Sequence, residues 1–299
     1  MSDFLLSIEN SGHAGQVALG LALLAAASHA IFGALQKGRH DPWLSRGAID
    51  FCYGAMALPV ALFLVPLPVG SQWWLLVGAA VIHLGYKLAQ AMAYTRGAFT
   101  VVYPIVRGTG PLVTVLAAGV VFGEAYSLAQ WGGVLLLSGG IFALAALNIA
   151  QAGVGRRRLM EAVALALVTG LLTAFYTTYD AYGIRQTPNP FTFLAWFFVF
   201  DGVIFPWIAA WRYWNMPDRP PLPGLIHRGV IGGLVAYVSF GSIMLATRID
   251  KVGQAAVIRE TSVVFAALIG WLFLKERVGP ARAVLVCVIA LGAVVVEFG

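Results

Sequence analysis

Long apolar runs separated by short polar segments dominate the chain. Most runs are close to the ~20 residues that a helix needs to cross a hydrocarbon core about 30 Å thick. A β-barrel would instead show segments of ~10 residues in which apolar and polar positions alternate. The pattern therefore predicts an all-α integral membrane protein with ten transmembrane helices, at 15–37, 43–66, 72–95, 98–121, 127–149, 161–183, 191–211, 224–246, 253–274 and 279–297.

Polar residues of the first half recur in the second half at a spacing of 152 positions. The matches are Thr95-Arg96 with Thr247-Arg248, Arg107 with Arg259, Thr109 with Thr261 and Glu124 with Glu276. Ordered matches of this kind indicate a duplication. We expect one five-helix repeat at 1–150, a basic linker at 151–160 and a second repeat at 161–299. Because five is odd, the second repeat is inverted, an arrangement that places a transporter's site near the midplane of the membrane.

Composition agrees with a membrane protein. The chain is 60% hydrophobic and 11% charged, with a mean hydropathy of +0.84, which is more apolar surface than a soluble fold buries. The net charge of +6 does not indicate nucleic acid, because the basic residues lie at the ends of apolar runs and not in a patch with aromatics. Cys52 and Cys287 lie inside apolar runs and no Cys/His pattern is present, so we expect no metal, no cofactor and no disulfide framework.

The basic residues predict the orientation in the membrane. One set of loops holds twelve Lys and Arg residues and the alternate set holds three: Arg185, Arg248 and Lys251. The bias makes the first set cytoplasmic and both termini extracytoplasmic, as in a multi-pass protein of a bacterial-type inner membrane. The twelve are Lys37, Arg39, Arg46, Arg96, Arg156, Arg157, Arg158, Arg212, Arg219, Arg228, Lys275 and Arg277. Residues 1–14 lack the basic start of a signal peptide, so we expect no cleavage.

Arg107 belongs to a polar stripe in the fourth predicted helix. Burying a charge at a helix centre costs about 2.5–3.5 kcal/mol, so an arginine there needs a partner or a water-filled cavity. The stripe consists of Thr100, Tyr103, Arg107, Gly110 and Thr114, at steps of three and four. Pro104 and the sequence RGTGP (107–111) predict that the helix is interrupted near Arg107. A structural role for Arg107 and a role in gating or substrate contact both remain open.

Lys87 lies on a similar stripe in the third predicted helix, with His83, Gln90 and Tyr94 at spacings of four and three and with Tyr86 beside them. An ammonium group in this setting can hold a substrate carboxylate, or it can belong to a structural ion pair. His83 can line the site or act as a packing residue.

The sixth predicted helix supplies the opposite charge. Tyr176 and Asp180 share a face with Thr169 and Thr173, and a carboxylate among tyrosines suits an ammonium group. The alternative is that Asp180 lies in water at the membrane interface. Asp201, in the seventh helix, is expected to pair with one of the arginines.

Glu260 directly follows Arg259 in the ninth helix. The two side chains are expected to point about 100° apart, so they cannot both face one neighbour and at least one meets a different partner. Glycines in the fifth and tenth helices predict scaffold or dimer packing there, and a monomer and a dimer both remain open.

Three motifs carry a family resemblance: RGTGP (107–111), FGE (122–124) and VIRETSVVFAALIGWLFLKERV (257–278). With the duplicated five-helix unit, the chain resembles the EamA branch of the drug/metabolite transporter superfamily over nearly its whole length, and within it the YddG-type amino-acid exporters. The resemblance implies two inverted repeats around a central cavity and export of small metabolites by alternating access.

We therefore expect a wet central cavity that binds a small-molecule substrate such as a neutral or aromatic amino acid. The carboxylate would meet Lys87 or Arg107 and the ammonium Asp180 or Glu260. The predicted substrate-binding residues are His83, Tyr86, Lys87, Tyr103, Arg107, Tyr176, Asp180, Tyr237, Arg259 and Glu260. The alternatives are another small cargo (a cationic drug, a sugar or a nucleotide derivative) or a non-transporting scaffold. The chain contains no HExxH or GxSxG sequence, so we do not expect an enzyme.

Overall fold

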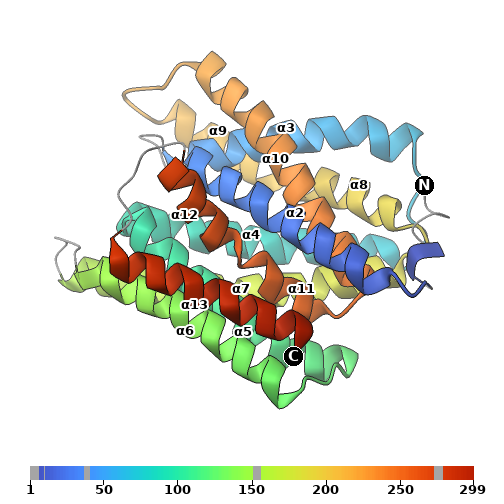
Figure 1. Ribbon diagram of the computed structural model, residues 1–299. Coiled ribbons are helices and arrows are strands. Elements are labelled where there is room, and N and C mark those ends of the chain that lie inside the picture. Colours follow the sequence, from blue (N-terminus) through green and yellow to red (C-terminus); the bar gives the residue numbers. More distant parts are fainter. Residues whose placement is uncertain (1–6, 10, 37–40, 151–155, 273–278) are drawn as a thin grey trace.

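The computed structural model describes residues 7–9, 11–36, 41–150, 156–272 and 279–299, and these residues form helices and no β-strand. The helices are α2 (Ala14–Gln36), α3 (Pro42–Phe63), α4 (Gln72–Arg96), α5 (Phe99–Phe122), α6 (Leu128–Ala150), α7 (Arg156–Gln186), α8 (Pro190–Asp201), α9 (Ile204–Trp214), α10 (Leu222–Ile249), α11 (Val252–Arg259), α12 (Ser262–Leu272) and α13 (Pro280–Phe298). They lie side by side in one bundle (Figure 1). Ten helical stretches are long and apolar enough to cross a membrane, which confirms the predicted all-α, ten-span fold.

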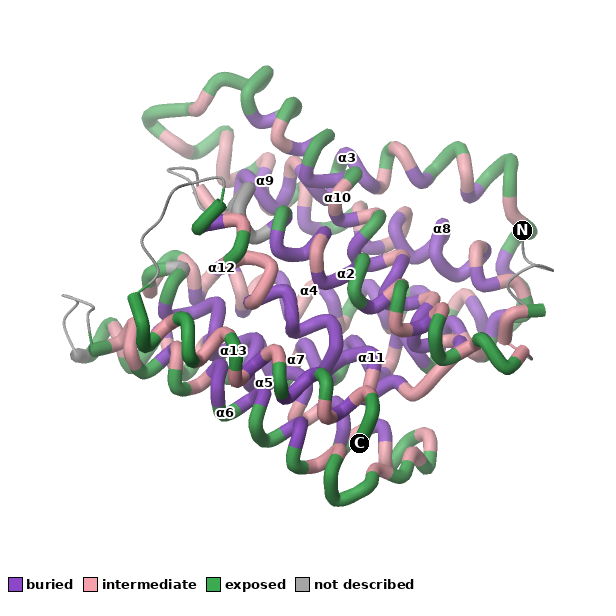
Figure 2. The backbone as a smooth tube through the Cα atoms, viewed as in Figure 1, coloured by how far each residue is buried: buried purple, intermediate pink, exposed green. Residues whose placement is uncertain are grey.

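Burial in the bundle separates a polar-containing interior from an apolar outside (Figure 2). Large apolar side chains such as Val120 and Trp207 are 87% and 74% exposed. Lys87 and Asp50, by contrast, are 1% and 0% exposed. Exposed large apolar side chains together with buried charged ones fit a bundle whose outer faces contact lipid.

Two spans are each built from two helices. The seventh span is α8 followed by α9, with the break at Gly202–Val203, and the ninth is α11 followed by α12, with the break at Glu260–Thr261. At the first break α3 comes very close, because a Cβ on Gly202 would lie 2.8 Å from the carbonyl oxygen of Asp50. Only a residue without a side chain fits there.

The fourth span, α5, runs from Phe99 to Phe122 without the predicted helix break near Arg107, although Pro104 and Pro111 each remove one N–H from its hydrogen-bond ladder. Pro104 lacks the N–H that would bond to the carbonyl oxygen of Thr100. Asn148 of α6 donates its side-chain amide to that oxygen at 2.8 Å. A neighbouring helix thus supplies the missing hydrogen bond, which is how prolines are tolerated in membrane helices without a break. The interruption lies instead at Glu260, in the ninth span.

The packing of the helices follows a scheme with two equivalent halves. α4 packs against α7 as α10 packs against α2, and α5 packs against α7 as α11 and α12 pack against α2. α3 lies along α8 and α9, and α6 lies along α13. Exchanging the first five spans for the last five leaves these pairings unchanged. The repeats at 1–150 and 161–299 stay a prediction. Of the expected linker, residues 151–155 lie outside the described residues, and 156–160 form the first turns of α7.

Glycines of the fifth and tenth spans form the contact between these two helices of the same chain. A Cβ on Gly133 of α6 would lie 2.8 Å from the carbonyl oxygen of Gly292 in α13. The two backbones therefore approach closely, as small residues allow in membrane helices.

Arg46 is not the loop residue that the charge distribution suggested. It lies near the start of α3, is 7% exposed, and its Nε is 2.7 Å from Asp50 Oδ1. Removing it from the loop count changes the ratio of basic residues from twelve to three into eleven to three, so the predicted orientation is unchanged. Arg46 belongs to the buried interior.

Candidate functional site

Seven polar side chains from α3, α4, α7 and α8 meet inside the bundle. We name them the Lys87 cluster: Arg46, Asp50, Tyr53, His83, Lys87, Asp180 and Asp201. Lys87 Nζ lies 2.6 Å from Asp50 Oδ2 and 2.6 Å from Asp201 Oδ1. It also donates to the Tyr53 hydroxyl at 3.0 Å, and this hydroxyl donates to the Asp201 carboxylate. The structure therefore favours the ion-pair role for Lys87 over direct contact with a substrate. Asp201 pairs with this lysine and not, as expected, with an arginine.

His83 joins α4 to α7 in the same cluster. Its Nε2 lies 2.8 Å from Asp180 Oδ2, and its Nδ1 lies 3.9 Å from Asp201 Oδ1. The His83 ring is 4.3 Å from the ring of Tyr176, which lies 4.9 Å from the ring of Tyr86. Asp180 is 3% exposed, so it lies in the interior and not in water at the interface.

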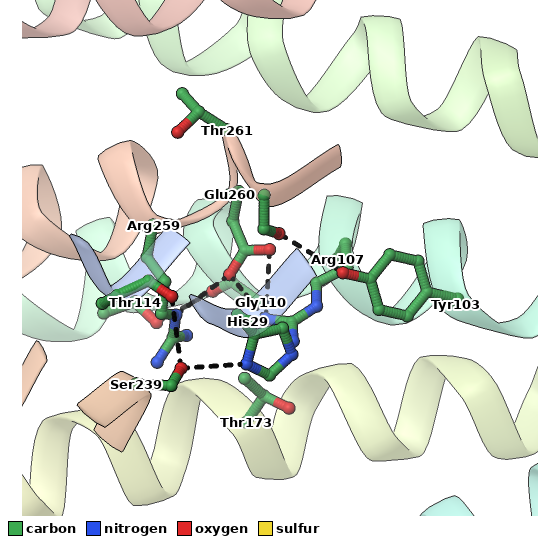
Figure 3. Close-up of polar contacts among 12 residues, drawn as sticks. His29, Tyr103, Arg107, Gly110, Thr114, Thr173, Ser239, Arg259, Glu260 and Thr261 are labelled. Atoms are coloured by element: carbon green, nitrogen blue, oxygen red, sulfur yellow. Dashed lines mark hydrogen bonds and ion pairs between the residues drawn. The ribbon is translucent and has the colours of Figure 1, made fainter. Parts of the chain in front are cut away.

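Glu260, at the break between α11 and α12, is the centre of a second group (Figure 3). We name it the Glu260 cluster: Arg107, Arg259 and Glu260. Arg107 Nη1 donates to the two carboxylate oxygens of Glu260 at 3.1 and 3.2 Å, and Arg259 Nε lies 3.3 Å from Oε1. Glu260 meets Arg107, in keeping with the expectation that at least one of the adjacent residues meets a different partner. Arg259 and Glu260 also contact each other, because the helix ends at Arg259 and the turn brings their side chains together. Tyr103 covers Arg107, with 5.2 Å between the ring centre and the guanidinium carbon.

A small buried cavity lies between the two clusters. Its volume is about 10 Å³, which is room for about one water molecule. The polar residues lining it are His29, Arg46, Tyr86, Gln90, Tyr94, Tyr103 and Arg107. This cavity in the described part of the chain is far smaller than the wet central cavity expected from the sequence. Beside it, Arg46 and Arg107 form ion pairs with Asp50 and Glu260, and the bundle is closed around this space.

The predicted site residues fall into three groups. His83, Lys87 and Asp180 belong to the Lys87 cluster. Arg107, Arg259 and Glu260 form the Glu260 cluster, with Tyr103 against it. Tyr86 and Tyr176 lie beside His83. Tyr237 lies apart from these, since its ring stacks on Phe198 at 4.1 Å and it is not among the residues that line the cavity.

Arg46 and Asp50 were missed as interior residues by the sequence analysis. The signal was present, because Arg46, Asp50 and Tyr53 follow one another at steps of four and three on α3, as the recognised stripes do on other helices. In the described part of the chain, no group of three or more His, Cys, Asp or Glu side chains is arranged to hold a metal ion.

Residues 160–298 match the EamA-like transporter family. We call this matched segment the EamA-like domain. The family is one of membrane transporters of small molecules. A comparison with curated proteins gives no match. A solved structure titled only "Crystal structure of protein" has a TM-score of 0.72 and 17% sequence identity, and it covers 95% of this chain and 98% of its own. That likeness shows that the fold extends beyond the EamA-like domain to the first five spans.

Ion pairs join the EamA-like domain to the first five spans at both ends of the bundle. Arg96 Nε lies 3.6 Å from Glu161 Oε2, and Arg248 Nε lies 3.4 Å from Glu9 Oε2. The two pairs are related by the same spacing of 152 positions that relates Arg96 to Arg248. Their burial differs: the side chains of Arg96 and Glu161 are 41% and 46% exposed, against 7% and 31% for Arg248 and Glu9.

Glu124 adds hydrogen bonds between the two halves at the Arg248 end of the bundle. Its carboxylate accepts hydrogen bonds from the backbone N–H groups of Val252 and Gly253, at 2.7 and 3.1 Å. These groups begin α11 of the EamA-like domain, where a negative charge is favourable. The Tyr126 hydroxyl donates to the same carboxylate, and burial together with this bond raises the pKa of Tyr126 above its ordinary value. The connection after α5 is thereby attached to the start of α11.

Proposed function

We propose that the protein is a secondary transporter of small zwitterions, above all neutral or aromatic amino acids, and that it works by alternating access. The observation that carries this proposal is that Arg46 and Arg107 line one buried cavity. In the described residues their ion pairs use Nε of Arg46 and Nη1 of Arg107. A guanidinium group has five N–H donors, so both arginines have further donors for a substrate carboxylate.

The ion pairs at the cavity favour a zwitterion over a simple anion. An anion that takes Arg107 leaves Glu260 with one cation fewer, and breaking a buried pair by removing one partner costs about 3–5 kcal/mol. A zwitterion offers a carboxylate to Arg107 and an ammonium group to Glu260, so both charges stay compensated. In this proposal the substrate carboxylate binds Arg107 or Arg46. It does not bind Lys87, because the Lys87 ammonium is already paired with two aspartates.

The aromatic lining of the cavity supports amino acids with apolar or aromatic side chains. Phe32, Tyr86, Tyr103 and Phe240 surround the space beside the two arginines. Aromatic rings bury large apolar groups and also contribute polar edges. A bulky cargo requires the bundle to open, because the closed cavity has room for about one water molecule.

The unequal ion pairs at the two ends support alternating access. In this conformation the Glu9–Arg248 end is the more tightly closed, and the Arg96–Glu161 end is more exposed. Rocking of one five-helix unit against the other would loosen the Glu9–Arg248 end and tighten the Arg96–Glu161 end, and it would open the cavity to each side in turn. In this proposal the ends rich in Lys and Arg face the cytoplasm of a bacterial-type inner membrane, both termini face outward, and the net flux is export.

Flux measurements test this proposal. Purified protein in liposomes should exchange radiolabelled L-phenylalanine and L-leucine across the membrane, and quaternary amines, sugars and nucleotides should move at least tenfold more slowly. If no cargo class is exchanged by protein that remains folded, the transport proposal fails and a scaffold role is favoured. Faster movement of another class would replace amino acids as the cargo.

Arg107→Gln is expected to reduce the exchange at least tenfold, because it removes the charged donor for the carboxylate while Arg259 still compensates Glu260. Arg282→Gln is the matched control. Arg282 lies outside the cavity and donates to Asn148 at 2.9 Å, so this variant should keep the wild-type rate. Equal rates in both variants would remove Arg107 from the substrate site.

A further inference from the structure

We propose that His83 and Asp180 form a proton-binding site, and that His83 carries two ring protons in this conformation. The site is separate from the arginines that the proposed function assigns to the carboxylate. The coupling role of this site rests on the proposed transport function, because a proton that is bound and released between α4 and α7 can couple a pH gradient to movement of the cargo. The proton-binding step itself does not depend on the cargo.

The charge balance of the Lys87 cluster is the first argument. Three carboxylates, Asp50, Asp180 and Asp201, face two permanent cations, Arg46 and Lys87. All five are at most 7% exposed, and an uncompensated charge at such depth is expensive. One further positive charge inside the cluster balances it. His83 is the remaining group of the cluster that can supply this charge.

The geometry of the imidazole is the second argument. Its two nitrogens face two different carboxylates, Nε2 at 2.8 Å from Asp180 and Nδ1 at 3.9 Å from Asp201. A neutral imidazole has one N–H and would turn a lone pair toward one of these acids. An imidazolium donates from Nε2 to Asp180, and its Nδ1–H faces Asp201 Oδ1 at 3.9 Å, which is too long for a hydrogen bond but allows attraction between the two charges. The doubly protonated ring therefore fits its surroundings better than either neutral tautomer.

Asp180 is the carboxylate of the cluster that depends on this proton. Asp50 has Arg46 and Lys87, and Asp201 has Lys87 and the Tyr53 hydroxyl. The ion pair of Asp180 is with His83 alone among the described residues, and its Oδ1 accepts no hydrogen bond from them. Loss of the His83 proton would thus leave Asp180 without an ion-pair partner among the described residues, with the charge of the more distant Arg259 still acting on it, whereas the other two aspartates would keep their cations.

The surroundings of His83 explain how the proton is held and released. Two acids face the ring, Asp180 from α7 and Asp201 from α8. The other titratable groups around it are Tyr176 from α7, Lys87 and Tyr86 from α4, and Tyr53, which lies beyond Asp201 on α3. α10 contributes only the apolar ring of Phe240. His83 belongs to the first five spans and Asp180 to the EamA-like domain. Separation of α4 from α7 would remove the nearest anion, and Nε2 would pass its proton to water entering from the open side.

Nitrogen NMR of the histidine rings tests the proton site without any cargo. In protein labelled with ¹⁵N-histidine in lipid nanodiscs at pH 7, His83 should show both nitrogens protonated, with its signals identified by their loss in His83→Gln. Asp180→Asn should convert the ring to a singly protonated form, whereas Glu161→Gln, which changes an acid at the bundle surface, should not. A singly protonated His83 in the wild type, or a doubly protonated ring in Asp180→Asn, would overturn the proposal.

A transport measurement tests the coupling role and separates it from the cargo assignment. With L-phenylalanine, His83→Gln should keep exchange between equal pools but lose the accumulation driven by an imposed pH gradient. Retained gradient-driven accumulation would overturn the coupling role. If the wild type does not move phenylalanine at all, the proposed cargo is wrong, and the NMR result still decides whether the proton site exists.

Discussion

Lys87 illustrates what burial does to a charged residue in a membrane helix. Its position on a polar stripe is equally compatible with a substrate ligand and with an ion pair. The structure places its ammonium between Asp50 and Asp201, at 2.6 Å from each, with 1% of the residue exposed. Such a pair adds little net stability, but one partner cannot be removed without leaving unpaired buried charge.

The first prediction at the residue scale follows from this arrangement. Lys87→Met should lower the free energy of unfolding by about 3–5 kcal/mol, because two buried carboxylates lose their common cation. Thermal unfolding in detergent measures the change. Lys251→Met is the control, since Lys251 Nζ donates to a backbone oxygen in an exposed region, and it should shift the transition only slightly. An unchanged melting temperature for Lys87→Met would indicate that Lys87 is free to serve a substrate.

At the scale of the helix, the positions of breaks depend on neighbours more than on proline content. α5 contains Pro104 and Pro111 and remains continuous, whereas the ninth span contains no proline and is broken at Glu260. The helix stays continuous at Pro104 because the side-chain amide of Asn148 donates to the carbonyl oxygen of Thr100, which the proline leaves without a partner. A single helix sequence does not contain this information.

Close backbone contact makes Gly202 a sensitive position of the seventh span. In Gly202→Ala the new Cβ would lie 2.8 Å from the Asp50 carbonyl oxygen and 2.8 Å from Gly54 Cα, so α3 and the α8–α9 turn must move apart. Such overpacking costs about 1–3 kcal/mol, and thermal unfolding should show the loss. Gly132→Ala is the control, because no atom lies within 4 Å of a Cβ there and alanine favours the helix. Equal stability of the two variants would contradict the close contact.

At the scale of the whole molecule, the ion pairs at the two ends of the bundle are related by the spacing of 152 positions, but the two ends are not equally closed. Arg248 donates to the carbonyl oxygen of Thr187 at 2.7 Å in addition to its ion pair with Glu9. Its counterpart Arg96 has a longer and more exposed pair with Glu161. The first five spans and the EamA-like domain thus form a tight contact at one end and a loose contact at the other.

Arg248→Ala is therefore expected to loosen the bundle more than Arg96→Ala. Hydrogen–deuterium exchange should rise several-fold in the last turn of α7 in Arg248→Ala, because carbonyl contacts and an ion pair with a 7% exposed arginine are lost together. The start of α7 should change little in Arg96→Ala, because exposed ion pairs contribute about 0–1 kcal/mol. Equal effects at the two ends would contradict the unequal closure.

The sequence by itself determined the membrane fold, the ten spans and most of the charged residues that lie inside, because hydrophobic length and the cost of burying charge are local properties of a helix. It also contained the stripe of Arg46 and Asp50, which the same rule would have found. Only the tertiary structure decided which charges meet: Lys87 with two aspartates, Glu260 with two arginines, and His83 between Asp180 and Asp201. The physical reason is that an ion pair depends on distances between helices that are far apart in the chain, and these are fixed by the packing of the whole bundle.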